Sequence, residues 1–306
     1  MAAEQKRELD RGKMRTEASA ETSDETPAAI SAARSVVRGL AVITGASRGI
    51  GRAIAHRFYE AGYALVLNAR DEAALRRLTE ELEETSGQKN SVQEISEQKT
   101  SGWKTSEKAV RCRYVAGDIS EMETARRLMK AAEALSKELG LLHSIDVLIN
   151  NAGLAHIGLL QDMDAAEWNR ILGADLTGVF NTCREAVPLM LHAHSGRILN
   201  ISSVWGVVGA SCEVAYSAAK GGVNAFTAAL AKELAPSGIA VNALACGAVD
   251  TDMNGQLSEE ERAQLCVEIP AGRMAEPGEV ADFCLQLCNA STYLTGQTIR
   301  FDGGWI

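Results

Sequence analysis

Short apolar runs alternate with amphipathic helical patterns along most of this chain. The apolar runs that favour strands lie at residues 40–44, 64–68, 110–115, 145–149 and 197–202. Between them, apolar positions recur at intervals of three and four residues, which is typical of helices, over residues 53–61, 71–84 and 121–139. Strands that alternate with helices predict an α/β fold with right-handed crossovers. The ligand crevice of such a parallel sheet lies at the C-terminal ends of its strands.

Two segments interrupt the pattern. Residues 1–38 are charged, rich in Ser, Thr and Ala, and poor in large apolar residues, which predicts a disordered tail or a single frayed helix. Their seven acidic residues argue against an organellar transit peptide. Residues 85–108 are also polar and read as a surface insertion. Trp103 within it either holds the loop against the body or marks a partner contact.

Composition and charge exclude several classes of function. The 306 residues are 46% hydrophobic, which is enough for a large core in one or two globular domains. The net charge of -9, with no basic block beyond the N-terminal segment, argues against a nucleic-acid groove and against an anionic membrane surface. No apolar run reaches the roughly 18 residues of a membrane span, and no secretion signal opens the chain. We therefore expect a cytoplasmic protein.

The cysteines and histidines do not predict a metal site. Seven cysteines without paired spacing fit a reducing compartment. Cys284 and Cys288 share one face of a predicted helix, but no second Cys or His pair is near, so we interpret them as core residues. The five histidines form no pattern of metal ligands, and we predict that no metal is bound.

A glycine-rich turn joins the first strand to the first helix. It reads Thr44-Gly-Ala-Ser-Arg-Gly-Ile-Gly51 and leads directly into a helical pattern. In this context backbone N–H groups and the helix N-terminus can hold a pyrophosphate, so we interpret the turn as a cofactor-binding loop.

The end of the second strand indicates which cofactor. An acid at this position would accept hydrogen bonds from the 2'-hydroxyl of NAD, but the chain has Ala69 followed by Arg70. Arg48 in the glycine-rich turn adds a second cation, and two cations suit a 2'-phosphate. We therefore predict NADP(H), although either arginine alone also fits a solvated surface residue.

A serine, a tyrosine and a lysine follow the strand at 197–202. Tyr216 and Lys220 lie four residues apart, so they share a helix face, and Ser203 lies in the loop that precedes it. Lysine lowers the phenol's pKa, the phenol donates its proton to a developing alkoxide, and serine holds the oxygen, which suits carbonyl reduction. The spacing alone also occurs in helices where tyrosine is a core residue and lysine is solvated.

Two further strand ends carry candidate contacts. Gly117-Asp118-Ile119 follows the third strand, where Asp118 can accept a hydrogen bond from an adenine amino group. Asn150-Asn-Ala-Gly153 ends the fourth strand, and its small residues let the backbone approach a ligand closely.

Together, the glycine-rich turn, Asn150-Asn-Ala-Gly153, Ser203 and Tyr216-x-x-x-Lys220 resemble the short-chain dehydrogenases/reductases, over about residues 39–306. The resemblance implies a single Rossmann domain with a doubly wound parallel sheet of about seven strands. It implies that Tyr216 is the general acid, that Lys220 bonds the nicotinamide ribose, and that Ser203 orients the carbonyl.

The resemblance also implies cofactor contacts and an assembly. The implied contacts are Gly45, Ser47, Arg48, Gly49, Ile50, Gly51, Arg70, Asp118, Ile119, Asn151, Ala152, Gly153, Tyr216, Lys220, Gly247, Val249 and Thr251. Members of the family are mostly tetramers or dimers, which implies a homotetramer or homodimer paired through helices at about 164–191 and 216–234.

Two positions depart from the family's pattern. Asp175 stands where an asparagine usually feeds a water-linked proton relay, so we expect a carboxylate one water away from Lys220. Cys246-Gly247 replaces the usual Pro-Gly, which we expect to loosen the loop over the nicotinamide.

Three interpretations of the function remain, two of which differ in the substrate. The chain most resembles 3-oxoacyl-acyl-carrier-protein reductases, although these often carry basic residues where it has His194 and Ser237. Residues 203–214 and Gly303-Gly-Trp305 resemble a branch that includes the elongation factor P 5-aminopentanone reductases. There Glu213 either favours an amine-bearing substrate or is merely solvated. A catalytically weak cofactor-binding or sensing protein is the third reading.

Overall fold

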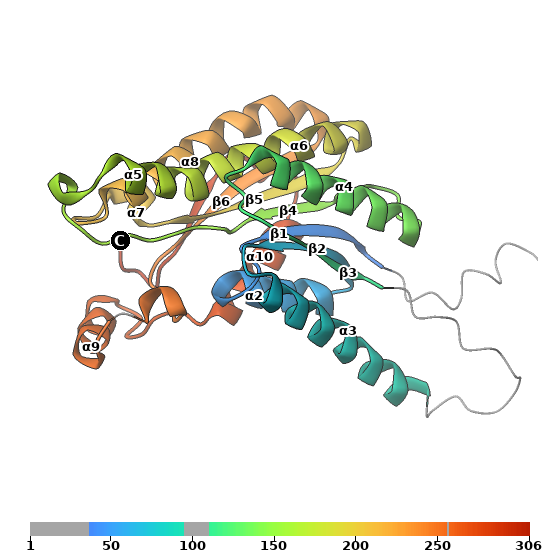
Figure 1. Ribbon diagram of the computed structural model, residues 1–306, viewed down its shortest axis with the longest axis horizontal. Helices are drawn as coiled ribbons and strands as arrows, with labels where there is room; N and C mark the ends of the chain where they lie inside the picture. The colour runs from blue at the N-terminus through green and yellow to red at the C-terminus, as the bar shows by residue number, and fades with distance from the viewer. Residues whose placement is uncertain (1–36, 95–109, 256) are drawn as a thin grey trace, which may run out of the picture. The chain divides into compact units, whose positions relative to one another are not determined.

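Within the residues that the computed structural model describes, 37–94, 110–255 and 257–306, seven strands form one parallel sheet in the order β3-β2-β1-β4-β5-β6-β7 (Figure 1). The strands are β1 (Gly39–Thr44), β2 (Tyr63–Ala69), β3 (Cys112–Ala116), β4 (Val147–Asn150), β5 (Gly196–Ser203), β6 (Ile239–Cys246) and β7 (Thr298–Phe301). The order reverses between β1 and β4, and this confirms the doubly wound Rossmann fold.

Helices cover both faces of the sheet (Figure 1). One face carries α2 (Gly49–Glu60), α3 (Glu72–Glu94) and α10 (Pro277–Asn289). The other carries α4 (Met122–Leu139), α6 (Gly178–Ala193) and α8 (Val214–Leu234). Shorter elements are η1 (Leu160–Asp162), α5 (Ala165–Leu172), the π-helical turn η2 (Gly173–Thr177), α7 (Trp205–Val208), η3 (Ala235–Ser237), η4 (Asp252–Asn254) and α9 (Glu259–Glu268).

The strands read as continuous apolar runs because both faces of the sheet are buried. In β1, Ala41 and Ile43 belong to the core beneath α2 and α10, while Leu40 and Val42 belong to the core beneath α4 and α6. All four side chains are fully buried. Strand β1 is therefore packed on both faces, and this fixes the position at which the glycine-rich turn after it begins.

A chain of buried amides and hydroxyls ties α6 and α8 to the sheet. Thr182 Oγ1 donates to Asn150 Oδ1 at 2.6 Å, Asn150 Nδ2 donates to Asn200 Oδ1 at 2.9 Å, and Asn200 Nδ2 donates to Thr227 Oγ1 at 2.8 Å. Because buried polar groups are costly when unpaired, this network specifies how the two helices pack on β4 and β5.

Some expected boundaries differ in the structure. Helix α3 reaches Glu94, so the expected insertion at 85–108 begins as helix, and only its remainder, with Trp103, lies outside the described residues. The expected tail lies outside them up to residue 36. Helix α8 begins at Val214, two residues before Tyr216.

Cys284 and Cys288 are buried against the sheet on α10, which confirms that they are core residues. Among the described helices, none is both long and apolar enough to cross a membrane.

Candidate active site

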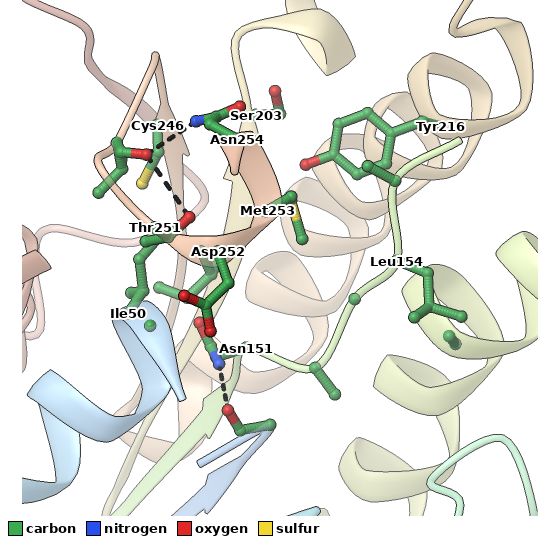
Figure 2. Close-up of a pocket in the computed structure, with 18 of the residues that line it drawn as sticks. Ile50, Asn151, Leu154, Ser203, Tyr216, Cys246, Thr251, Asp252, Met253 and Asn254 are labelled. Atoms are coloured by element: carbon green, nitrogen blue, oxygen red, sulfur yellow. Dashed lines mark hydrogen bonds between the residues drawn. The ribbon is translucent and has the colours of Figure 1, made fainter. Parts of the chain in front are cut away.

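A cavity of about 720 Å³ opens at the C-terminal ends of the strands. It is lined by the loops that follow β1, β2, β3, β4, β5 and β6 and by the start of α8. Every residue expected to contact the cofactor lines it except Gly51, and Ser203 lines it as well. Figure 2 shows the Tyr216 phenol pointing into this cavity, on the side where Ser203 lies.

Strand β5 and helix α8 place the serine, the tyrosine and the lysine together. Ser203 ends β5 and its Oγ accepts a hydrogen bond from Trp205 N at 3.1 Å. Lys220 lies one helical turn after Tyr216, with its Nζ 5.5 Å from the centre of the phenol ring. Its ammonium also donates to Ile201 O at 3.0 Å, which anchors the lysine to β5.

Asp175 lies directly against Lys220. Its Oδ1 is 3.2 Å from Lys220 Nζ, so the expectation of an intervening water is wrong. Its Oδ2 accepts a hydrogen bond from Leu154 N at 2.8 Å. Oδ1 is within ion-pair distance of the ammonium but makes no well-directed hydrogen bond. We regard the contact as an ion pair because each of the two buried groups favours the charged form of the other.

The local backbone explains this close contact. Asp175 lies in the π-helical turn η2, a distortion that is frequent at functional sites and that turns the carboxylate inward. A Cβ at Gly153 would lie 2.6 Å from Asp175 Oδ1 and 3.3 Å from Lys220 Nζ. Glycine at position 153 thus makes room for the ion pair as well as lining the cavity.

The three ionisable groups influence one another. Burial raises the pKa of the Asp175 carboxyl, and the charge of Lys220 offsets part of that rise. Burial acts to lower the pKa of Lys220, but the adjacent carboxylate and phenol outweigh it, so this pKa is raised. Burial raises the pKa of Tyr216; Lys220 opposes the rise and Asp175 adds to it. The phenol is therefore protonated at neutral pH and can act as a proton donor.

The glycine-rich turn forms a cradle at the start of α2. Gly45 and Gly49 have φ of 65° and 53°, which side-chain-bearing residues rarely adopt. A Cβ at Gly51 would lie 2.2 Å from Gly45 O. Gly51 therefore packs directly against the backbone of the turn, and it does not line the cavity. No acidic residue occupies the first turn of α2, which leaves its N–H groups available to an anion.

The loop after β4 is fixed to this turn. Thr44 Oγ1 accepts hydrogen bonds from Asn151 N at 3.0 Å and from Ala152 N at 3.1 Å. Asn151 Nδ2 donates to Thr44 O and to Gly45 O, both at 3.1 Å, and Figure 2 draws one of these two bonds. Four hydrogen bonds therefore join the two loops on either side of the strand-order reversal.

Arg48 and Arg70 both line the cavity and both are exposed. Within the described part of the chain, neither has an acidic partner within 4.0 Å. Strand β2 ends at Ala69, directly before Arg70, so no carboxylate occupies the strand end. Asp118, which follows the neighbouring strand β3, also lines the cavity, and its Oδ1 accepts a hydrogen bond from Ser120 N.

The loop after β6 closes one side of the cavity. Cys246 is buried, and burial raises the pKa of its thiol to about 12, so the thiol stays neutral. Gly247 N donates to Phe301 O at 2.9 Å, which ties this loop to β7 although proline is missing. Beyond it, Thr251 Oγ1 and Asn254 Nδ2 donate to Val249 O at 3.5 Å and 2.8 Å (Figure 2).

The other side of the cavity carries two tryptophans that the sequence did not assign to the site, beside Glu213, which the sequence offered as a contact for an amine-bearing substrate. Trp205 and Trp305 meet edge to face, with ring centres 4.9 Å apart and planes at 61°. Glu213 lines the cavity beside them, and burial raises the pKa of its carboxyl while a hydrogen bond with the Trp205 side chain lowers it. Trp305 was missed because only the folded chain brings the C-terminus to this place.

Comparisons with known proteins identify the family of this chain. The family model of short chain dehydrogenases matches residues 39–95 and 87–262. An uncharacterized oxidoreductase of Bacillus subtilis, YmfI, is 36% identical over 87% of this chain and 98% of its own length. The 3-oxoacyl-[acyl-carrier-protein] reductase FabG of Staphylococcus aureus is 35% identical over 86% and 96%. That of Aquifex aeolicus is 34% identical over 87% and 96%.

A solved structure shares the fold. The crystal structure of a putative gluconate dehydrogenase from Agrobacterium tumefaciens is similar with a TM-score of 0.74 and 29% identity, over 88% of this chain and 96% of that one. The family match covers most of the described chain, and the sequence relatives exceed 30% identity over nearly their whole length. The chain therefore belongs to the short-chain dehydrogenase family, whose members are oxidoreductases that act on C–OH and C=O groups.

Proposed function

We propose that this protein reduces a ketone to a secondary alcohol with NADPH as hydride donor. The observation that carries the proposal is the place of the Tyr216 phenol, which points into the cavity near Ser203 and Lys220 (Figure 2). Burial raises the pKa of this phenol, which keeps it protonated and able to act as a proton donor. A donor in this place protonates the oxygen of a carbonyl as negative charge develops on it.

The residues of the chain divide the chemistry among them. When bound, the reduced nicotinamide supplies a hydride to the carbonyl carbon. Ser203 Oγ, held by the Trp205 amide, donates a hydrogen bond to the carbonyl oxygen. Tyr216 gives its proton to the same oxygen, and the charge of Lys220 stabilises the phenolate that remains. The phenolate then recovers a proton from solvent, so charge and protons balance over one turnover.

The cavity fits the proposed cofactor. The positive φ of Gly45 and Gly49 and the uncovered start of α2 suit a pyrophosphate. Arg48 and Arg70, without acidic partners among the described residues, suit a 2'-phosphate, which supports NADP(H) over NAD(H).

For the substrate, we propose a 3-oxoacyl group of the kind carried on acyl-carrier protein. The relatives named as 3-oxoacyl-[acyl-carrier-protein] reductases support this proposal, because they match this chain over nearly all of their length. The ketone of a 3-oxoacyl thioester is activated by the thioester carbonyl one methylene away, and a cavity open to solvent suits a substrate that is tethered to a carrier.

A second candidate is the reduction of aminopentanone-modified elongation factor P, and the charge of the cavity favours it. Among the described lining residues, the cations other than Lys220 are Arg48 and Arg70, in the cofactor half. Glu213 and Glu268 also line the cavity, with two tryptophans beside Glu213. Carboxylates and indole rings attract an amine and disfavour an acidic carrier protein.

One assay separates the two substrates. Purified protein is given NADPH with a 3-oxoacyl thioester in one arm and with aminopentanone-modified elongation factor P in the other. Turnover of only one assigns the class of substrate. If neither these nor an activated small ketone is reduced while NADPH still binds, the remaining reading, a cofactor-sensing protein, is supported instead.

We also propose that the enzyme is cytoplasmic and works as a homotetramer or homodimer that pairs through the α5–α6 helices and α8. In support, α6 leaves Phe180 at 46% and Leu191 at 37% exposed, which is unusual for large apolar side chains unless a partner covers them. Sedimentation of the wild type and of a Phe180→Asp variant tests this, since the variant should dissociate.

A further inference from the structure

The last five residues of the chain form a tight turn. Asp302 Oδ1 accepts a hydrogen bond from Gly304 N at 3.0 Å, and its Oδ2 accepts one from Ile306 N at 3.2 Å. Trp305 N donates to Asp302 O at 3.2 Å. Arg300 Nη1 donates to Ile306 O at 2.6 Å, so a cation holds the end of the chain. The conformation of the C-terminus is thereby defined by its own contacts.

This turn is fixed to the walls of the cavity. Ala271 N donates to Gly303 O at 3.1 Å, just after α9. Gly303 has a φ of 65°, and a Cβ there would lie 2.9 Å from the side chain of Ile269. A Cβ at Gly247 would lie 2.8 Å from the backbone of Asp302, so the turn also packs closely on the loop after β6.

The result is that Trp305 lines the cavity at the end of α8 that carries Tyr216. It meets Trp205 at 4.9 Å in the edge-to-face arrangement that aromatic rings favour. Trp205 in turn donates its backbone N–H to Ser203 Oγ. Leu154, Ile157 and Leu265 line the same cavity and add apolar surface. Two rigid indoles thus face the place where a substituent of the carbonyl must lie.

We propose that Trp305, together with Trp205, sets the size of the ketone substituent that the site accepts, so that the turn at residues 302–306 is part of the substrate site. The proposal rests on the proposed ketone reduction. An indole is bulky and has few rotamers, and the two rings pack against each other, so together they limit the length of acyl chain that this side of the cavity accepts. Compact ketones are the class that fits within this limit.

The test uses a series of 3-oxoacyl thioesters of increasing chain length. The wild type is compared with Trp305→Ala, and with Trp305→Phe as a variant that keeps a ring. Tyr293→Ala is the matched control, because this aromatic is 95% exposed and does not line the cavity. The quantity measured is the ratio of kcat/KM for the longest and the shortest substrate.

We expect Trp305→Ala to raise this ratio on the order of tenfold or more, the scale of discrimination by one or two methylenes in an apolar pocket. Trp305→Phe should raise it less, and Tyr293→Ala should leave it unchanged. An unchanged ratio in Trp305→Ala would overturn the proposal. A loss of kcat that is equal for all substrates would also overturn it, because Trp305 would then act only by supporting Trp205.

A failure of the proposed ketone reduction can be told apart from a failure of the proposed role of Trp305. If no ketone is reduced, the affinities of the same series are measured by calorimetry with NADP+ present. A length preference that relaxes in Trp305→Ala would then support the substrate wall while contradicting the reductase. If the wild type binds substrates of all lengths equally well, the proposed role of Trp305 in limiting the substituent is contradicted as well.

Discussion

Asp175 Oδ1 lies 3.2 Å from Lys220 Nζ, and the two side chains are 0% and 5% exposed. The lysine of the site is therefore part of a buried ion pair, in which the anion partly cancels the field of the cation at Tyr216. A neutral amide at position 175 would leave that field at full strength. The ion pair is the feature of this site that most affects the proton donor.

We therefore predict that Asp175→Asn lowers the pKa of Tyr216. In the reduction direction the phenol must be protonated, so activity falls as pH rises through this pKa. With the anion removed, the phenol becomes more acidic, and the basic limb of the pH–rate profile should move to lower pH while maximal turnover is kept or increased.

The pH dependence of kcat for the two proteins checks this prediction. In the oxidation direction the acidic limb should move to lower pH as well, because the phenolate forms earlier. If the pH profile of Asp175→Asn equals that of the wild type in both reaction directions, Asp175 is protonated in the wild type and imitates the amide.

Arg48 and Arg70 should decide the choice of cofactor. Charge-assisted contacts to a 2'-phosphate contribute about 1.5 to 3 kcal/mol each, so replacing either arginine by alanine should weaken NADPH binding on the order of tenfold or more. NADH binding should hardly change. Fluorescence titration measures both, with Arg126→Ala as the control because this arginine does not line the cavity. Equal use of NADPH and NADH by the wild type would contradict the assignment.

Glu213 should distinguish cationic from neutral ketones. If its carboxylate receives a substrate amine, Glu213→Gln should lower kcat/KM for an amino-ketone on the order of tenfold and leave a neutral ketone of equal length unaffected. Glu268→Gln serves as a comparison, because this side chain lines the same cavity. Equal losses for both ketones would show that Glu213 acts through packing.

Gly51 should be intolerant of any side chain. Because a Cβ would lie 2.2 Å from Gly45 O, Gly51→Ala should cost about 1–3 kcal/mol of unfolding free energy and weaken cofactor binding. Gly278→Ala is the matched control, since a Cβ there has no atom within 4 Å. Urea unfolding of both variants is the measurement, and equal stability would argue against a strained turn.

The sequence predicted the parts of this site that depend on strand ends and local spacing. Apolar runs that stop at a glycine or asparagine locate the strand ends, and parallel strands must bring those ends to one edge. The four-residue spacing of Tyr216 and Lys220 needs only a regular helix. These features depend on residues that are close together in the sequence, so the sequence was sufficient to predict them.

What the sequence did not predict depends on irregular backbone or on tertiary contacts. The inward turn of Asp175 needs a π-helical turn that apolar periodicity does not reveal. The approach of Trp305 to Trp205 joins positions 100 residues apart and requires the C-terminal turn. Helix α3 runs past residue 85 because Glu, Gln and Lys are good helix formers even where no apolar stripe remains.

The reduction of an activated ketone by the wild type and by Tyr216→Phe tests the central claim most directly. NADPH consumption and the alcohol formed are followed together, and NADPH affinity is measured for both proteins. We expect alcohol production by the wild type and a loss of about 10²–10⁴-fold in the variant with cofactor affinity kept. A wild type that binds NADPH without reducing any ketone, or a variant that is as fast as the wild type, would contradict it.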